Sequence, residues 1–434
     1  MDIVISQIHT LSTNNDSDLK KLRDFLRHEQ ETLKANARQI DQALQMLDPT
    51  QNTMGVAFLL AAQMSAAAPP PADQAATFAY VGNFLKLADE HQVKKASLPV
   101  SAVCKSYAQM AIDEGQKAML RSLRPLRCAV EKLRPNAETL TPVHAEFLRV
   151  CLKAKAYHMA GPVLDQPIFD VSLSSNGSCP QMTPQSFLCY FYYGALIRIG
   201  MKEYAQALRL LLVVLTCPAS CLSAIQADAY KKYVLVSLKV HGELQTLPIY
   251  ASSIVQRFAK SPSYVLEIAD AFKQCDPAVL RRLMEEKAQQ IQADNNVGLA
   301  KQVAGSLQRH KVRTLTKTYL TLSLAEIARE VGMEGGTAEV EDLLFDMISA
   351  GEINARIDQT TGNVSFEEEE DEMDVAMVGR MQDTLQQILG LAQRVSSFEQ
   401  EVVSSEAYVR KMAALEGGAG GAVAPVGGYD FMDM

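Results

Sequence analysis

The chain has 434 residues, of which 48% are hydrophobic, and a formal net charge of -8. This composition can fill a sizeable core, and its acidic balance gives no general affinity for the phosphates of nucleic acid or for an anionic membrane. The N-terminus lacks a basic segment and no run reaches about 18 apolar residues, so we expect neither a signal peptide nor a membrane span.

The residues that usually carry chemistry are scattered. The eight cysteines form no CxxC pair and have no histidine at zinc-binding spacing, so we interpret them as small hydrophobic side chains in a reducing compartment. The phosphate-loop, dinucleotide and H-E-x-x-H motifs do not occur. We interpret the basic pairs Lys231–Lys232 and Arg281–Arg282 as solvated helix faces. The sequence therefore predicts no catalytic residues, no cofactor-binding residues and no metal ligands, and hence no enzyme.

Residues 1–184 alternate helical stretches with breaks, and we assign them to N-terminal helical repeats. Leu19, Leu22, Phe25 and Leu26 form a stripe at helical spacing, as expected for helices that bury one face each.

Residues 185–310 continue the alternation and contain one unit similar to a tetratricopeptide repeat. The small, aromatic and proline positions of that repeat are matched at or near their usual spacing by Phe191, Ala195, Tyr204, Ala207, Leu211, Val214 and Pro218. Arg198 stands where an aromatic residue is expected, so the unit is degenerate. Because such helix pairs bury their faces only by stacking, we expect a mainly α, TPR-like, right-handed solenoid.

Residues 311–366 predict a winged helix. Ser323 and Glu326 form a capping box before a helix that Gly332 ends. Thr337 can cap a second helix, which Gly351 follows and whose core stripe is Val340, Leu343, Leu344, Met347 and Ile348. The alternating apolar residues of 353–366 then predict a β-hairpin, the wing.

The second helix of this module is an unsuitable surface for nucleic acid. Its polar face carries only acidic residues, Glu339, Glu341, Asp342 and Asp346, and the wing has one cation, Arg356. Phosphate affinity comes from cations that displace counterions. We therefore interpret the module as one that contacts proteins.

The C-terminal part divides into an acidic linker, a long helix and a tail. Residues 367–374 are nearly all acidic. Over 375–415 apolar residues recur at steps of three and four, with one step of seven near Glu406, which predicts a long helix with a single apolar seam. Such a helix needs a partner surface. Residues 416–434 are rich in glycine and poor in core residues, so we expect a disordered tail.

Several stretches carry a family resemblance: FLCYFYYGALIRIG at 187–200, AYKKYVLVSL at 229–238, LPIYASSIVQRF at 247–258, DNNVGLAKQ at 294–302 and RTLTKTYLTLSLAEIA at 313–328. In order and spacing, they resemble the subunit 3 family of the COP9 signalosome, a branch of the PCI-domain proteins. The resemblance covers residues 140–366 best. It implies that 185–310 and 311–366 are the helical and winged-helix parts of a PCI domain.

The resemblance also implies a function. The chain would be a scaffold in the complex that removes the ubiquitin-like modifier NEDD8 from cullin-RING ubiquitin ligases. The zinc site of that complex lies on another type of subunit, whose H-x-H is absent here. Two alternatives stay open: a PCI subunit of the proteasome lid or of a translation initiation factor, and a nucleic-acid-binding winged-helix regulator.

From the same resemblance we expect other signalosome subunits as partners, no nucleic acid or membrane, no cofactor, and residence in nucleus and cytoplasm. PCI winged helices associate edge to edge, so the expected wing contact comprises Ile353, Ala355, Ile357, Val364 and Phe366. Signalosome subunits also bundle their C-terminal helices, so the expected seam contact comprises Met381, Leu385, Ile388, Val395, Phe398 and Val402.

Overall fold

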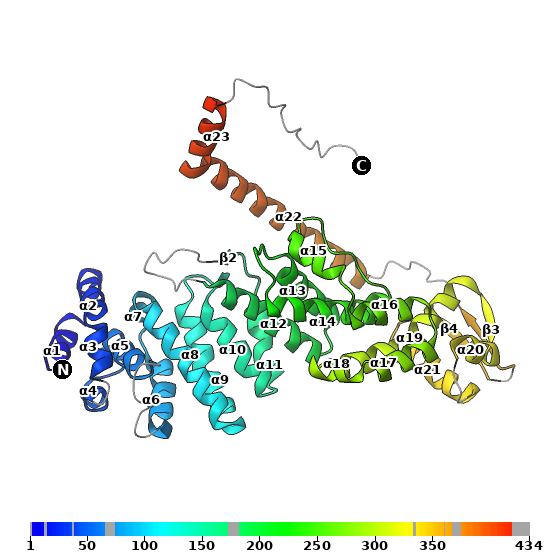
Figure 1. Ribbon diagram of the computed structural model, residues 1–434, viewed down its shortest axis with the longest axis horizontal. Coiled ribbons are helices and arrows are strands. Elements are labelled where there is room, and N and C mark those ends of the chain that lie inside the picture. Colours follow the sequence, from blue (N-terminus) through cyan, green and yellow to red (C-terminus); the bar gives the residue numbers. More distant parts are fainter. Residues whose placement is uncertain are drawn as a thin grey trace. The chain divides into compact units, whose positions relative to one another are not determined.

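The computed structural model describes residues 2–12, 15–36, 39–65, 74–171, 182–332, 336–359, 361–366 and 375–418. Within these ranges the protein is mainly α-helical, with one two-stranded and one three-stranded sheet (Figure 1). The chain divides into two compact units: Met1–Ile353 with Ile357–Ser365, and Asn354–Arg356 with Phe366–Met434.

The N-terminal region consists of helices that pack on others close to them in the sequence. Their bounds are α1 Asp2–Leu11, α2 Asp16–His28, α3 Gln30–Ala35, α4 Ile40–Met46, α5 Thr53–Gln63, α6 Gln74–Leu87, α7 Glu90–Lys95, α8 Ser97–Glu114, α9 Gln116–Leu133, α10 Pro142–Lys153 and α11 Tyr157–Leu164. Strands β1 Thr139–Leu140 and β2 Asp170–Val171 pair in parallel.

Apolar periodicity and capping explain these helices. In α2 the residues at helical spacing, Leu19, Leu22 and Leu26, are buried. Helix α10 has Pro142 at its first position, and its cap residue Thr141 forms a capping box with His144. One continuous apolar core joins the buried side chains from Val4 to Ile197, which supports the prediction of helices that each bury one face.

The next region contains a second apolar core. Its helices are α12 Pro184–Gly200, α13 Tyr204–Thr216, α14 Ala224–His241, α15 Ser253–Ala259, α16 Tyr264–Lys273, α17 Pro277–Glu286, α18 Ala288–Ala293 and α19 Val297–Thr318. Helix α12 contributes Tyr190 and Ile197 to the first core and Leu188 and Ala195 to the second. The expected division between residues 184 and 185 therefore falls at a helix that both cores share.

The predicted repeat unit is the helix pair α12–α13. Ala195, Ala207 and Leu211 are fully buried where the two helices pack. Arg198, in place of the expected aromatic, is also buried. Its guanidinium lies 2.5 Å from carboxylate oxygens of Asp165, after α11, and of Glu203, in the turn before α13. The aliphatic part of the Arg198 side chain fills the helix interface, while its guanidinium links α12 to the end of α11 and to the turn before α13.

The winged helix has the predicted elements and one more strand. Helix α20 is Leu324–Val331 and α21 is Thr337–Ser349; β3 is Thr321–Ser323, β4 Ala355–Asp358 and β5 Asn363–Phe366. The capping box of Ser323 is present, and Gly332 and Gly351 have φ of 77° and 67°, the left-handed backbone that glycine adopts most easily. The sheet order is β3-β5-β4, so the hairpin gains a third strand.

Two sequence-based expectations in this region are wrong in detail. The predicted boundary between residues 310 and 311 is not one of them, although it lies within α19, which continues from the helical region directly into the winged helix. Thr337 is the first residue of α21 and not its cap; Gly336 holds the cap position, without a side-chain hydrogen bond. In the predicted stripe, Val340, Leu344 and Met347 are buried, while Leu343 and Ile348 are half-buried.

The C-terminal stretch forms two helices and not one. Helix α22 spans Val375–Ser404 and α23 spans Glu406–Gly418, so the single helix expected over 375–415 is interrupted at Ser405. The break falls where the apolar repeat takes its step of seven. The second helix also continues to Gly418, three residues into the expected tail. The acidic linker 367–374 and residues 419–434 lie outside the described residues.

Among the helices that the structure describes, none combines the length and apolar character needed to cross a membrane.

Candidate functional site

The wing presents a strand edge and few apolar side chains. Strand β4 is an outer strand of the β3-β5-β4 sheet, so within the described residues one side of its backbone has no neighbouring strand and can pair with a strand of another chain. Of the five predicted contact residues, Ile353, Val364 and Phe366 are buried, and Ala355 and Ile357 are half-buried. Their side chains build the module's own core. A partner would therefore meet the backbone of β4 and its outward side chains, Arg356 and Asp358.

The outer face of α21 is acidic, as predicted. Glu339, Asp342 and Asp346 are exposed, and Glu341 is half-exposed and accepts a hydrogen bond from Gln359. Phe345, at 67% exposure, lies among them. An exposed aromatic ring surrounded by carboxylates suits a protein surface better than a phosphate backbone.

Helix α22 carries the predicted seam, and the seam is exposed to solvent. Met381, Leu385 and Ile388 are 51%, 59% and 54% exposed, and Val395, Phe398 and Val402 are 65%, 49% and 56% exposed. Three further apolar side chains of α22, which the predicted seam does not contain, are equally exposed: Leu389, Leu391 and Val403. At ~100° per residue they flank the seam on the same side of the helix, so the apolar face covers about half of its circumference.

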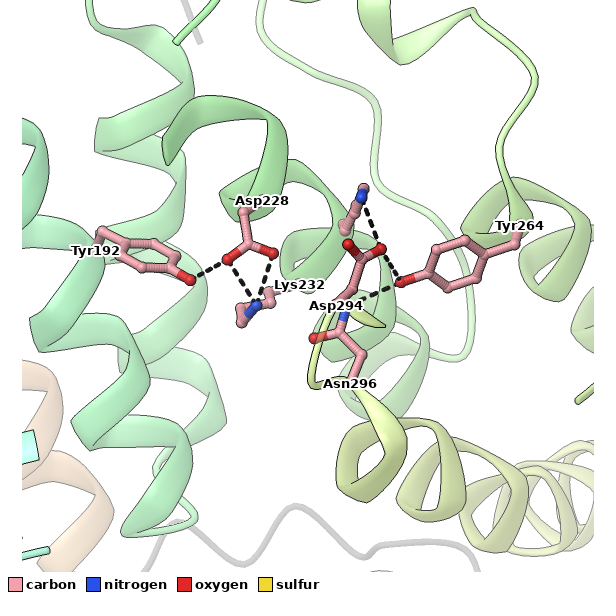
Figure 2. Close-up of polar contacts among 7 residues, drawn as sticks. Tyr192, Asp228, Lys232, Tyr264, Asp294 and Asn296 are labelled. Atoms are coloured by element: carbon pink, nitrogen blue, oxygen red, sulfur yellow. Dashed lines mark hydrogen bonds and ion pairs between the residues drawn. The ribbon is translucent and has the colours of Figure 1, made fainter. Parts of the chain in front are cut away.

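Within the helical stack, two lysines of α14 hold a polar network (Figure 2). Lys232, almost fully buried, donates to both carboxylate oxygens of Asp228, at 2.8 and 2.9 Å. The Tyr192 hydroxyl of α12 donates to the same carboxylate. Burial, and next the hydrogen bond to Asp228, raise the pKa of Tyr192, so the phenol keeps its proton.

The neighbouring lysine holds the second half of this network. Lys231 Nζ lies 2.6 Å from Asp294, in the turn before α19, and the Tyr264 hydroxyl of α16 donates to the same oxygen at 2.8 Å. The fully buried Asn296 donates to Tyr264 at 3.0 Å. Burial by itself would raise the pKa of Asp294, but hydrogen bonds from Lys231 and Tyr264 outweigh it and keep that pKa low.

The interpretation of Lys231–Lys232 as a solvated face is therefore wrong, because both lysines bind carboxylates inside the helical stack. Arg281 and Arg282 are exposed, as expected. The network brings the stretches at 229–238 and 294–302 together in space. The contact between Lys231 and Asp294 joins residues 63 positions apart, so no local pattern in the sequence reveals it.

The network has a structural and not a catalytic arrangement. Each carboxylate is paired with its own lysine. None of these groups combines a shifted pKa with the lack of a partner, as a general acid or base would. In the part of the chain that the structure describes, no cluster of three or more His, Cys, Asp or Glu side chains is arranged to hold a metal.

Comparison with known proteins decides the family. The family model "COP9 signalosome complex subunit 3, N-terminal helical repeats" matches residues 16–255, and the PCI domain model matches residues 274–368. The chain is 32% identical over 416 residues to COP9 signalosome complex subunit 3 of Arabidopsis thaliana, covering 95% of this chain and 93% of the relative. It is 29% identical over 420 residues to the Drosophila melanogaster protein of the same name, covering 94% and 93%.

The chain belongs to the COP9 signalosome subunit 3 family. The expected fold class is thereby confirmed, since helical repeats followed by a PCI domain account for most of the chain. Neither of these domains is a catalytic one, and the chain is a non-catalytic member of the signalosome family. The two matched ranges divide between residues 255 and 274, whereas our boundaries at 184 and 310 stay a prediction.

Proposed function

We propose that this chain is a scaffold subunit of the COP9 signalosome, the complex that removes NEDD8 from cullin-RING ubiquitin ligases. The observation that carries the proposal is the match to subunit 3 across both its repeat region and its PCI domain, over 94% or more of the chain. A non-catalytic chain of stacked helices contributes to such a complex by holding other subunits in position.

The partners that we propose are other signalosome subunits. The exposed edge of β4 offers backbone groups for strand pairing, and the apolar face of α22 offers a surface for helix packing. The acidic face of α21 supports the exclusion of nucleic acid. We further propose residence in nucleus and cytoplasm. The seven described cysteines are free thiols, which agrees with a reducing compartment.

Affinity purification of the tagged chain, followed by mass spectrometry, tests this function. The expected result is recovery of the remaining signalosome subunits in comparable amounts, together with activity that removes NEDD8 from a cullin. The chain purified alone should lack that activity and should hold no stoichiometric zinc by elemental analysis. Recovery of proteasome-lid or initiation-factor subunits in place of signalosome subunits would overturn the proposal.

A further inference from the structure

Four basic side chains line a cleft of about 680 Å³ inside the helical stack. Lys202 lies in the turn between α12 and α13, and Lys239 lies in the last turn of α14. Arg309 and Arg313 lie one turn apart on α19. The lining contains a single carboxylate, Glu352, so the cleft has an excess of positive charge.

The existing ion pairs do not remove this excess. Glu352 lies 3.0 Å from Arg309 and 3.3 Å from Arg313, so one carboxylate serves two guanidinium groups. Asp346, outside the lining, lies 3.9 Å from Arg309 and is largely exposed. Among the described residues, no carboxylate lies within ion-pairing distance of Lys202 or Lys239.

Lys239 is held toward the cleft without an anionic partner. Its ammonium lies 4.8 Å from the centre of the Tyr204 ring, and the Tyr204 hydroxyl is fixed by donating to Gln302 at 2.8 Å. Burial lowers the pKa of Lys239, and repulsion by Arg309 lowers it further. Glu352 acts in the opposite direction but does not restore the usual pKa. An anion in the cleft would relieve this repulsion.

The walls of the cleft are fixed in advance. Gly242 has φ of 76°, and a Cβ on it would come within 2.1 Å of the His310 ring, so only glycine allows this close approach. Lys202, although not a glycine, has φ of 66°. The turn after α12 is closed by a hydrogen bond that the Lys202 N–H donates to the Ile199 carbonyl oxygen, at 3.0 Å. This backbone holds Lys202 in a defined position at the cleft.

We propose that this cleft binds a small ligand that carries at least two phosphoryl groups. Guanidinium forks and lysine ammonium groups are the side chains that recognise phosphoryl oxygens. A single carboxylate ligand would bring one negative charge, whereas two phosphoryl groups bring enough to compensate the whole cluster. The volume is in the range of small-molecule sites and is too confined for a nucleic-acid duplex. This proposal goes beyond the scaffold function and does not depend on it.

Calorimetric titration of the full-length chain with tripolyphosphate, at about 150 mM salt, tests the proposal. We expect saturable binding of one equivalent. A second titration uses a peptide with two adjacent phosphoserines, because the same chemistry can come from a free polyphosphate or from a phosphorylated partner segment. Binding of tripolyphosphate supports the proposal, whereas binding of the peptide alone would overturn it in favour of a phosphorylated partner segment.

Two pairs of variants identify the site. Lys202→Gln with Lys239→Gln should weaken binding at least tenfold, while Lys202→Arg with Lys239→Arg should retain it. Arg281→Gln with Lys301→Gln removes the same charge from a different groove, lined by α17, α18 and α19, and should leave the affinity unchanged. Thermal unfolding confirms that each variant is folded. No saturable binding of either probe, or an equal loss in the control pair, would overturn the proposal.

Discussion

At the scale of single residues, the helical stack depends on charges that are paired in its interior, either within α14 or between α14 and the turn before α19. Lys232 is only 7% exposed at its side chain, while its partner Asp228 is 32% exposed. Removal of Asp228 would leave an ammonium group in a site that excludes water. Breaking such a pair is more destabilising than the pair is stabilising, because the unpaired charge keeps its desolvation penalty.

Asp228→Ala should lower the free energy of unfolding by about 3 kcal/mol. The double variant Asp228→Ala with Lys232→Met should recover most of this loss, since the buried charge is then absent. Chemical denaturation of the isolated chain measures both. Glu286→Ala is the matched control: its pair with Arg282 has the same helical spacing but is exposed, and we expect a change of at most ~0.5 kcal/mol. Equal effects at Asp228 and Glu286 would contradict the argument.

His144 makes stability dependent on pH. Burial lowers its pKa from 6.5 to about 4, and its Nδ1 accepts the Thr141 backbone N–H at 3.1 Å, which requires the neutral ring. The unfolded chain therefore binds a proton more readily than the folded chain does. The contribution of His144 to stability is complete above pH 6.5 and is lost as the pH falls toward 4.

His144→Gln should flatten this dependence. Glutamine at the third helical position preserves the capping box but does not titrate. Between pH 7 and pH 5 we expect the wild-type chain to lose about 2 kcal/mol more of its unfolding free energy than the variant loses, as shown by denaturation at both pH values. His241→Gln, at an exposed position, serves as control and should follow the wild-type curve. Parallel curves for wild type and His144→Gln would refute this role.

At the scale of elements, local patterns predict the fold well. The capping box at Ser323, the left-handed glycines 332 and 351, and the alternation over 353–366 each depend on near neighbours, and all are present. The third strand of the winged helix was missed, although the alternating residues of YLTLSL at 319–324 carried a weak signal for it. Its pairing with β5 joins residues 40 to 44 positions apart, which no local pattern reveals.

The candidate sites were predicted less completely, for the same reason. The periodicity of α22 shows which side chains share a face, so the seam was found. Periodicity does not show where a helix ends when no glycine or proline marks the end, so the break at Ser405 was not predicted. For the wing, alternation identified an inner face correctly, but the residues on that face are buried, and the available surface is the backbone edge of β4.

The edge of β4 gives a prediction at this scale. Ala355→Pro removes a backbone N–H from the edge strand and should weaken entry of the chain into the signalosome. Co-purification of the other subunits with the tagged variant measures this effect. Ala355→Ser, which keeps the N–H, is the control and should assemble normally. A folded proline variant that recovers all subunits at wild-type yield would exclude β4 as a contact.

At the scale of the whole molecule, the chain separates a body with filled cores from a C-terminal segment whose apolar side chains are exposed. Two continuous cores account for the helices up to α19. Helix α22, in contrast, exposes about half of every large apolar side chain along its seam. The seam runs about 32 Å from Met381 to Val402. An apolar stripe of this length that faces solvent indicates a surface that another molecule covers.

The last prediction concerns this seam. Burial of a large apolar side chain contributes on the order of 2 kcal/mol, so Ile388→Asp with Phe398→Asp should weaken assembly at least a hundredfold. Gln386→Asp with Ser397→Asp adds the same charge on the opposite side of α22 and should assemble normally.

Truncation at Glu368 should give a folded body with unchanged thermal stability that fails to enter the complex. Hydrogen exchange distinguishes the alternatives: protection of 381–402 only in the assembled complex indicates a bundle with other subunits. Strong protection in the isolated chain, with a lower melting temperature after truncation, would show that the helix instead packs on its own body.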